Sequence, residues 1–353
     1  MMGRWFGASV ASIKKRLLIF SALFGLAFLS GVSRAAQIDE HERKLVEGAK
    51  KEGRMVYYTA MSIEDARALA QGFESKYAFI KTDIFRSGHE RILSRLNVEH
   101  KTGRHAADAV IVGEFEIHHL KKLGLIAPYH SPRAAGFTEG LKDPDGYWTD
   151  VYDNLVVTAY NVNKVKPEEI PRRYEDLLHP RWKGRMALDH NEDRWVSNLL
   201  SIMGKEKGVE FLRALSKQNI YIRRGRSLIT QLLLAGEFDL QITAYWYRVH
   251  RLMRSGAPLR WVGIEPALLA LHPISLAVNA PHPNAARLFI DYVVSEEGQI
   301  VFARRGREAA RPGIKPEGFP GQLKVLPSRP QLAENLEENN RLFEALFLKG
   351  VSP

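Results

Sequence analysis

The sequence predicts an α/β protein whose core is divided into two lobes, and three observations indicate it. Strand patterns alternate with amphipathic helix patterns, which is typical of parallel sheets with helices on their faces. The chain has 353 residues, of which 45% are hydrophobic, enough for a packed core that splits into two lobes. It contains no cysteine, so this core must stabilise the protein without disulfides.

The first half of the chain supplies three strand-and-helix pairs. Strands are expected at Met55–Thr59, Ile80–Phe85 and Ala107–Val112. A capping pattern from Ser62 to Asp65 follows the first strand, and apolar residues at helical spacing continue from it. The third helix is expected to open at Gly113 and to end at Gly124. This alternation predicts one parallel sheet.

The second half is less regular. Residues 167–185 are rich in Pro, Arg and aromatic residues and are expected to form an irregular surface passage. Ile220–Tyr247 has the pattern of a strand, a helix ended by Gly236, and a second strand that stops at three aromatic residues. Further strands are expected at Leu155–Asn161, Leu259–Val262 and Ile274–Val278, and further helices at Asn284–Val294, Gly298–Arg304 and Leu336–Leu348.

The N-terminus has the pattern of an export signal. Arg4 and the basic cluster Lys14–Arg16 precede the apolar run Leu17–Leu29, and Ser33 and Ala35 occupy the −3 and −1 positions of a cut after Ala35. Because the apolar run is too short to span a bilayer comfortably, we expect residues 1–35 to be a cleaved signal peptide. No cysteine follows that could carry a lipid anchor, so a soluble periplasmic protein is expected.

The charge balance argues against nucleic acid as a partner. The chain has 51 Lys and Arg against 40 Asp and Glu, and part of the basic excess lies in the expected leader. The remaining mild positive charge supports an attraction for small anions and no more. The absence of cysteine also excludes thiolate metal sites.

The Ile220–Tyr247 unit carries the strongest functional signal. A helix begins at its glycine turn, where free backbone N–H groups and the positive end of the helix dipole favour an anion. Three aromatic residues follow at the carboxyl end of the next strand, where open α/β sheets place ligands. The ligand-binding residues expected in this unit are Gly225, Arg226, Ser227, Tyr245, Trp246 and Tyr247.

Two turns in the first half of the chain have the same character. The ligand-binding residues expected there are Thr59, Ser62, Arg86, Ser87 and Gly88. Plain N-capping is the alternative for each turn, but two of the three turns contain an arginine, which capping does not need and which suits carboxylate or phosphate. Because alternate strand residues face opposite sides, at least one of the three aromatic rings is expected to pack in the core.

Several strings along the chain carry a family resemblance. The most specific are Leu177–Gly184, which reads Leu-Leu-His-Pro-Arg-Trp-Lys-Gly, and Ser295–Gln299. The others are Val56–Ser62, Ala107–Val110, Gly124–Pro128, Tyr160–Asn161, Gly236–Asp239 and Pro283–Ala286. On these strings the chain resembles the type II periplasmic solute-binding proteins of ABC transporters, in the iron(III)-type branch.

The resemblance implies two α/β lobes joined by two hinge-crossing strands, for which Leu155–Asn161 and Ile274–Val278 are the candidates. The implied organisation is lobe 1 at 36–153 and 273–315, lobe 2 at 154–272, and a C-terminal helical tail at 316–353. The resemblance also implies a monomeric binding protein that is not an enzyme, needs no cofactor, and delivers its solute to an inner-membrane permease.

The sequence leaves two classes of ligand as alternatives. A small anionic organic solute of carboxylate or phosphate type fits Arg226, Ser227 and the aromatic rings better. A ferric ion is the alternative, with Glu114, Tyr245 and Tyr247 as its ligands. Similar iron-binding members use a histidine in the first loop and two adjacent tyrosines, whereas here that loop has no histidine and a tryptophan follows the first tyrosine.

Two other functions are alternatives to a transport receptor. A hydrolase is disfavoured because the exported part contains neither Gly-x-Ser-x-Gly nor His-Glu-x-x-His. A receptor that serves a sensor kinase in place of a permease stays open. If Arg226 anchors the solute, its replacement by Ala is expected to weaken binding by about tenfold or more and to leave the melting temperature nearly unchanged.

Overall fold

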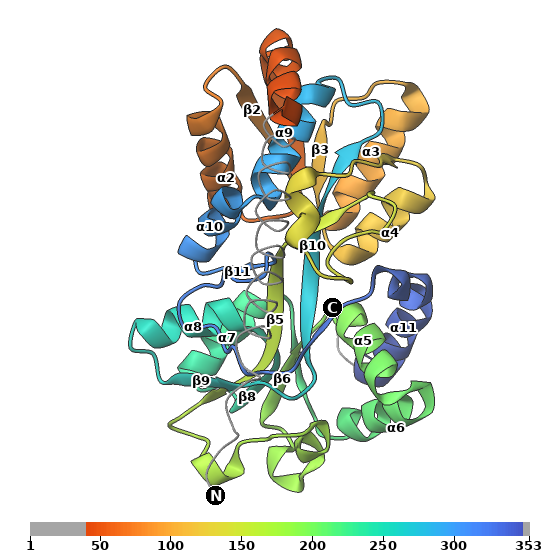
Figure 1. Ribbon diagram of the computed structural model, residues 1–353. Helices are drawn as coiled ribbons and strands as arrows, with labels where there is room; N and C mark the ends of the chain where they lie inside the picture. The colour runs from red at the N-terminus through yellow and green to blue at the C-terminus, as the bar shows by residue number, and fades with distance from the viewer. Residues whose placement is uncertain (1–39, 349–353) are drawn as a thin grey trace, which may run out of the picture.

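Two long central strands join the two lobes of the protein. The computed structural model describes residues 40–348, so the expected signal peptide and its cleavage site lie outside the described residues. Figure 1 shows one lobe above the other, with β5 (Thr149–Asn161) and β10 (Ala267–Ala277) running through both. The two strands are antiparallel to each other. The predicted two-lobed α/β fold with two hinge-crossing strands is therefore confirmed, and both strands begin earlier than expected.

The first lobe is built on the strand order β2-β1-β3-β10. The three N-terminal strands are parallel and β10 is antiparallel to β3. Phe73 and Phe289 meet in its core with ring centroids 5.1 Å apart. The elements of this lobe, besides a helix over residues 40–52, are β1 (Arg54–Thr59), α2 (Ile63–Lys76), β2 (Lys81–Arg86), α3 (His89–Thr102), β3 (Ala109–Ile111), α4 (Glu114–Lys122), β4 (Ile126–Ala127), η1 (Pro132–Gly136), α9 (Pro283–Val294) and α10 (Glu296–Arg304).

The second lobe continues the strand order as β5-β8-β6-β7, and β9 pairs with β5. The expected irregular passage contains only the short 3-10 helices η2 (Pro167–Glu169), η3 (Tyr174–Leu178) and η4 (Pro180–Trp182). The other elements are β6 (Met186–Asp189), α5 (Asp193–Met203), α6 (Lys205–Ser216), β7 (Tyr221–Arg223), α7 (Arg226–Ala235), β8 (Leu240–Tyr245), α8 (Trp246–Arg254) and β9 (Leu259–Val262). Of these, β6, α5, α6 and α8 were not anticipated from the sequence.

The C-terminal segment is tied to both lobes. In the first lobe Lys122 lies 3.3 Å from the carboxylate of Glu334, and in the second Asn339 donates to Ser197 at 2.9 Å. Its elements are β11 (Glu308–Ala309), β12 (Val325–Pro327), η5 (Pro330–Asn335), α11 (Leu336–Phe343) and a π-helical turn η6 (Glu344–Leu348). The tail therefore contains strand as well as helix, because β12 pairs with β10. The exact lobe boundaries stay a prediction.

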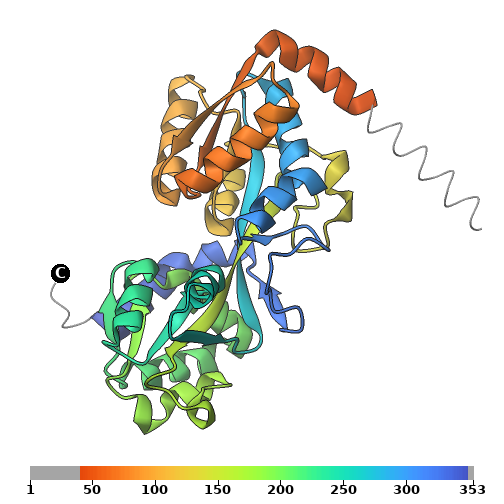
Figure 2. The ribbon, with the colours of Figure 1, turned by 90° about the vertical axis from the view of Figure 1, so that its left-hand side faces the viewer.

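Viewed from the side, the two lobes lie on opposite sides of a narrow waist that β5 and β10 cross (Figure 2). This arrangement brings the helix starts of one lobe toward those of the other. No helix within residues 40–348 combines the length and the apolar character that a bilayer crossing requires.

Candidate functional site

Five helices begin near the junction of the lobes without a capping side chain. Gly88 and Gly113 precede α3 and α4 in the first lobe. Glu192, Gly225 and Tyr245 precede α5, α7 and α8 in the second. The first N–H groups of an α-helix have no partner inside the helix, so each of these starts offers backbone donors. Helix starts favour negative charge in the space between the lobes, called here the cleft, and the first turns of α4 and α5 already place the carboxylates of Glu114, Glu116 and Asp193 there.

Arg194, in the first turn of α5, crosses the cleft from the second lobe to the first. Its Nη2 lies 2.6 and 2.5 Å from the two carboxylate oxygens of Glu116 on α4, and its Nη1 lies 3.5 Å from Glu114. Burial alone would raise the pKa of Glu116, but Arg194 and His89 outweigh it, and the pKa lies below its usual value. For Glu114 burial outweighs Arg194, so its pKa is raised. An ion pair thus links the lobes.

His89, the first residue of α3, packs against the same ion pair. Its Nδ1 accepts a hydrogen bond from the backbone N–H of Gly113 at 2.9 Å and lies 3.6 Å from the carboxylate of Glu116. Burial lowers the pKa of His89 to about 4, so the ring is neutral at neutral pH. A Cβ on Gly113 would lie 2.9 Å from Oε2 of Glu116 and 3.0 Å from Nη1 of Arg194, so a larger residue here would displace the ends of these side chains.

The structure gives the guanidinium of Arg226 a partner within its own lobe. Nη2 of Arg226 lies 2.6 Å from Oε2 of Glu192, and its Nε lies 3.2 Å from Oε1. Arg226 also donates to the Tyr245 hydroxyl and lies 4.6 Å from the centroid of that ring. Burial raises the pKa of Glu192 to about 7 although Arg226 opposes the shift. In this structure Arg226 is the counter-ion of the buried Glu192, and its role as the anchor of an anion stays a prediction.

The three aromatic residues take different places. Trp246 is fully buried and packs against His250 and Phe319, with ring centroids 4.7 and 5.5 Å away. Trp246 does not line the cleft in this arrangement, because the chain turns into α8 at this residue and directs its side chain into the core, and its role as a ligand contact stays a prediction. The expectation that at least one ring packs in the core is confirmed. Tyr245 and Tyr247 stack with centroids 6.1 Å apart.

Arg307 covers Tyr247 beside the hinge. Its guanidinium lies 3.9 Å from the centroid of the Tyr247 ring. It donates to Oδ2 of Asp65 at 2.9 Å and to Oδ1 of Asn154 at 3.2 Å. Burial alone would raise the pKa of Asp65, but Arg307 and Arg305 outweigh it and hold the pKa below its usual value. A paired arginine therefore occupies this end of the cleft, and Tyr247 is only 8% exposed.

The predicted residues of the first lobe divide into buried and accessible ones. The side chains of Thr59 and Ser87 are buried, so neither is a ligand contact in this arrangement. Ser62 caps α2 by accepting from the backbone N–H of Asp65 at 3.3 Å, which is the N-capping alternative. Arg86 and Gly88 are exposed. In the second lobe, the start of α7 leaves Gly225 exposed and Ser227 partly exposed.

The alternative iron ligands do not form a ready-made metal site. Glu114 is 1% exposed and lies beside Arg194, while the hydroxyl of Tyr245 accepts from Arg226. Within residues 40–348, no three or more His, Cys, Asp or Glu side chains are placed to hold a metal ion together. Tyrosines are outside that set of residue types, so Tyr245 and Tyr247 keep their place as candidate iron ligands.

Reasoning from the sequence missed several charged residues of the cleft, namely Glu116, Glu192, Arg194, Arg307 and Asp65. Of these, Glu192 and Arg194 lie where β6 passes into α5. The signal was present, because the apolar residues Met186–Leu188 are followed by the polar run Asp189–Arg194. It was hidden because β6 is only four residues long and no glycine marks the start of α5.

Comparison with known proteins gives the family. Residues 108–337, well over half of the chain, match the family model described as bacterial extracellular solute-binding protein. Iron uptake protein A1 of Synechocystis is 25% identical over 248 residues, covering 65% of this chain and 68% of that protein. The Fe(3+)-binding periplasmic protein of Serratia marcescens is 23% identical over 187 residues, covering 50% and 55%.

Solved structures share the fold. Iron-bound HitA of Pseudomonas aeruginosa superposes with a TM-score of 0.73 at 20% identity, over 83% of this chain and 99% of that one. AfuA of Actinobacillus pleuropneumoniae, bound to fructose-6-phosphate, gives 0.71 at 20% identity, over 84% and 99%. Two lobes around a helix-lined cleft, the expected sequence strings and the matched family model agree. The chain therefore belongs to the bacterial extracellular solute-binding proteins, a non-enzymatic family that serves ABC transporters, and resembles its iron(III)-type branch.

Proposed function

We propose that this protein captures a small anionic organic solute, of carboxylate or phosphate type, and delivers it to an ABC permease as a monomer. The observation that carries the proposal is the convergence of five uncapped helix starts on the cleft that Arg194 crosses. Backbone N–H groups at helix starts bind oxyanions without a net charge of their own, so they suit a solute that must be released again.

Arg194 replaces Arg226 as the expected anchor. The guanidinium of Arg194 already holds a carboxylate, that of Glu116, with contacts to both oxygens. A carboxylate or phosphate of a solute offers the same pair of oxygens and can take the place of Glu116. The side chain of Arg194 is 25% exposed, against 16% for Arg226, so it is the more accessible of the two.

The strength of such a site can be bounded. Each hydrogen bond to a charged group contributes roughly 1.5–3 kcal/mol. Three or four of them contribute roughly 5–12 kcal/mol before the cost of displacing Glu116 and closing the lobes, so micromolar affinity, about −8 kcal/mol, is an upper bound. Stacking on the exposed part of Tyr245 would favour a solute with an apolar or ring portion beside its anionic group.

Ferric iron is the second candidate, and the relatives favour it. Two curated relatives are named for iron, and HitA was solved with iron bound. In this chain Tyr245 and Tyr247 could supply phenolate oxygens, with Glu114 from the first lobe. Burial raises the pKa of Tyr245, and Arg226 opposes that shift only in part. Arg226 beside Tyr245 and Arg307 beside Tyr247 occupy the faces of both rings, which leaves a metal ion less room to reach the two phenolate oxygens.

Native mass spectrometry of the protein purified from its periplasm, with iron measured on the same sample, tests the proposal. We expect an organic anion at one per chain, iron well below one per chain, and no visible tyrosinate absorption. Ferric iron at one per chain, with a visible tyrosinate absorption band, would contradict the anion proposal and establish the alternative.

Matched variants locate the solute. Arg194→Gln should retain at least tenfold less of the anion, because one charge-assisted contact pair is lost. The control is Arg213→Gln, which removes an exposed arginine on α6, and it should retain the anion as the unsubstituted protein does. Equal retention by both variants would show that the solute is bound elsewhere.

A further inference from the structure

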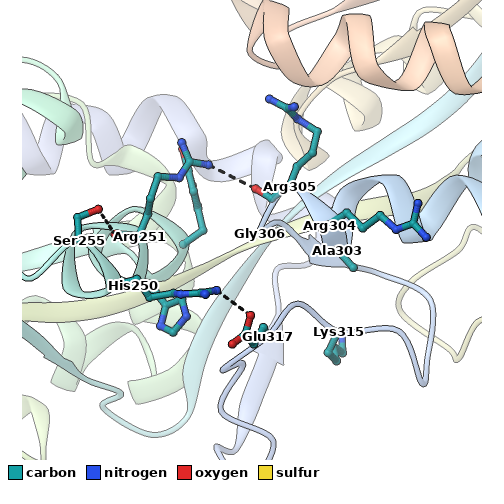
Figure 3. Close-up of a pocket in the computed structure, with 11 residues that line it drawn as sticks. His250, Arg251, Ser255, Ala303, Arg304, Arg305, Gly306, Lys315 and Glu317 are labelled. Carbon is teal, nitrogen blue, oxygen red and sulfur yellow. Dashed lines mark hydrogen bonds and ion pairs between the residues drawn. The ribbon is translucent and has the colours of Figure 1, made fainter.

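A cavity lies at the periphery of the gap between the lobes, where Tyr247 in the first turn of α8 forms part of its lining. It encloses about 550 Å³. One wall is the face of α8 that carries His250, Arg251 and Arg254, and the opposite wall is the end of α10 with the chain that follows it. Figure 3 shows His250 and Arg251 on one side of the space and Arg304 and Arg305 on the other, with the hinge strands behind. The cavity is therefore bounded by both lobes.

The lining of this cavity, called here the peripheral cavity, is strongly basic. Glu317 is its only carboxylate within the described residues. Its basic residues are Arg251, Arg254, Arg304, Arg305 and Lys315, besides His250. Like charges that converge on one space repel each other, and the repulsion is relieved when an anion enters it.

Two of the five cations have a carboxylate partner and three do not. Arg254 lies 2.7 Å from Glu317, and Arg305 pairs with Asp65 on α2. None of Arg251, Arg304 and Lys315 forms an ion pair with a carboxylate in the described part of the chain. The uncompensated charge therefore amounts to three unit charges, more than a monovalent anion can neutralise.

The walls of the peripheral cavity are held in position by their own contacts. Arg251 donates to the backbone carbonyl of Arg305 at 3.3 Å, a bond that ties α8 to the end of α10 (Figure 3). Lys315 donates to the carbonyl of Ala309 at 3.0 Å, and His250 stacks on the buried Trp246 with ring centroids 4.7 Å apart. A bound anion would meet a formed wall and would not have to order these elements.

We propose that the peripheral cavity binds a small, multiply charged anion whose charge is carried by two or more phosphate or carboxylate groups. The inference goes beyond the proposed function and does not depend on which solute the cleft takes. The volume exceeds what inorganic phosphate fills, and three uncompensated cations call for at least two negative charges. Because the walls come from both lobes, the anion contacts both at once and binds this arrangement of the lobes.

Titration calorimetry of the mature protein with pyrophosphate, at low and at high salt, tests the inference. Arg251→Gln and Lys315→Gln should each weaken pyrophosphate binding about three- to tenfold, because each removes one exposed charge-assisted contact. Glu317→Gln should strengthen it about threefold, since the variant removes the one carboxylate that competes for Arg254. Added salt should weaken binding to the unsubstituted protein, and inorganic phosphate should bind more weakly than pyrophosphate.

Two controls assign the effect to the peripheral cavity. Arg213→Gln, on the exposed side of α6, should bind pyrophosphate as the unsubstituted protein does. Arg194→Gln separates the peripheral cavity from the cleft, because Arg251→Gln should weaken pyrophosphate binding by the same factor whether or not Arg194 is also replaced. If Arg194→Gln weakens it while Arg251→Gln and Glu317→Gln do not, the anion occupies the cleft, which overturns this inference and supports the proposed function. Binding that none of the variants changes, or no binding at all, overturns it as well.

Discussion

The side chains of Arg194 and Glu116 join the two lobes through a fork of hydrogen bonds, with Nη2 of Arg194 at 2.6 and 2.5 Å from the carboxylate oxygens. Glu116 lies on α4 in the first lobe and Arg194 on α5 in the second. The ion pair therefore depends on the distance between the two lobes. It also occupies the part of the cleft that an anionic solute would enter.

Removing Arg194 should destabilise the protein, because the carboxylate of Glu116 then loses its counter-ion. Arg194→Met is expected to lower the free energy of unfolding by about 2 kcal/mol, toward the low end for a buried pair because this arginine is partly exposed. Urea unfolding at pH 7 measures it. Adding Glu116→Gln to Arg194→Met should restore most of the loss, because the unpaired charge is then gone. A double variant as unstable as Arg194→Met would contradict this account.

The stability of the Arg226→Ala variant distinguishes the structure from the expectation based on sequence alone. A free anion anchor could be removed without cost, whereas the observed partner of Arg226 is the buried Glu192. We expect the variant to lose about 2–4 kcal/mol of unfolding free energy, because Glu192 is left buried without a counter-ion. Thermal unfolding of the free protein is the measurement. A melting temperature equal to that of the unsubstituted protein would show that the ion pair does not form.

Two glycines at equivalent helix starts should respond differently to alanine. At Gly113 a Cβ would lie within 3.0 Å of both Glu116 and Arg194, whereas at Gly88 no atom lies within 4 Å of it. Gly113→Ala should therefore destabilise the protein by about 1–3 kcal/mol through overpacking and displacement of the ion pair. Gly88→Ala should change stability by less than about 0.5 kcal/mol and serves as the control. Urea unfolding of both variants in parallel checks the difference, and equal losses would refute it.

The carboxyl of Glu308 should make the protein less stable as the pH rises above neutral. The side chain is fully buried beside the hinge, where its Oε1 accepts from the backbone N–H of Leu155 at 3.4 Å, and burial raises the pKa of Glu308 to about 8. Because the unfolded chain releases this proton near pH 4.3 and the folded protein holds it to about 8, stability falls as the pH rises between these values. Glu308→Gln should reduce the fall between pH 6.5 and 8 by roughly 1 kcal/mol.

Above pH 6.5 the effect of Glu308 is no longer opposed by His89, and Glu192, whose pKa burial raises to about 7, adds a slope of the same sign up to that pH. Burial lowers the pKa of His89 to about 4, so the unfolded chain binds a proton there that the folded protein does not, and stability rises with pH from about 4 to 6.5. Below pH 6.5 this opposite slope masks the effect of Glu308 on the pH dependence of stability. Urea unfolding at several pH values makes the comparison, with the exposed Glu237→Gln as a control that keeps the slope of the unsubstituted protein. A slope unchanged by Glu308→Gln would exclude this residue as its source.

Reasoning from the sequence succeeded where local pattern and local structure agree. Met55–Thr59 and Asn284–Val294 were placed to within a residue of their observed bounds, because buried strands and amphipathic helices carry their period in the sequence. It failed at β6, which is four residues long, and at α8, where the helix starts inside a run of aromatic residues that favours a strand. Tertiary packing of Trp246 decided that second case.

The candidate site was predicted less well than the fold. Gly225 and Gly88 directly precede α7 and α3, and Arg86 ends β2, while their part in ligand binding stays a prediction. The sequence could not show that Arg226 neutralises Glu192, or that Arg194 reaches Glu116, since the partners are 34 and 78 residues apart. Ion pairs of this kind depend on how separate elements of the chain pack against each other, which no local pattern encodes.

The sequence by itself determined the α/β class, the two lobes, the crossing strands and the family, because periodicity, glycine turns and specific strings are local properties of the chain. Only the tertiary structure decided which cations of the cleft are already neutralised. Charge is visible in a sequence, but compensation of charge requires two groups at hydrogen-bond distance, and that distance exists only after the lobes have folded against each other.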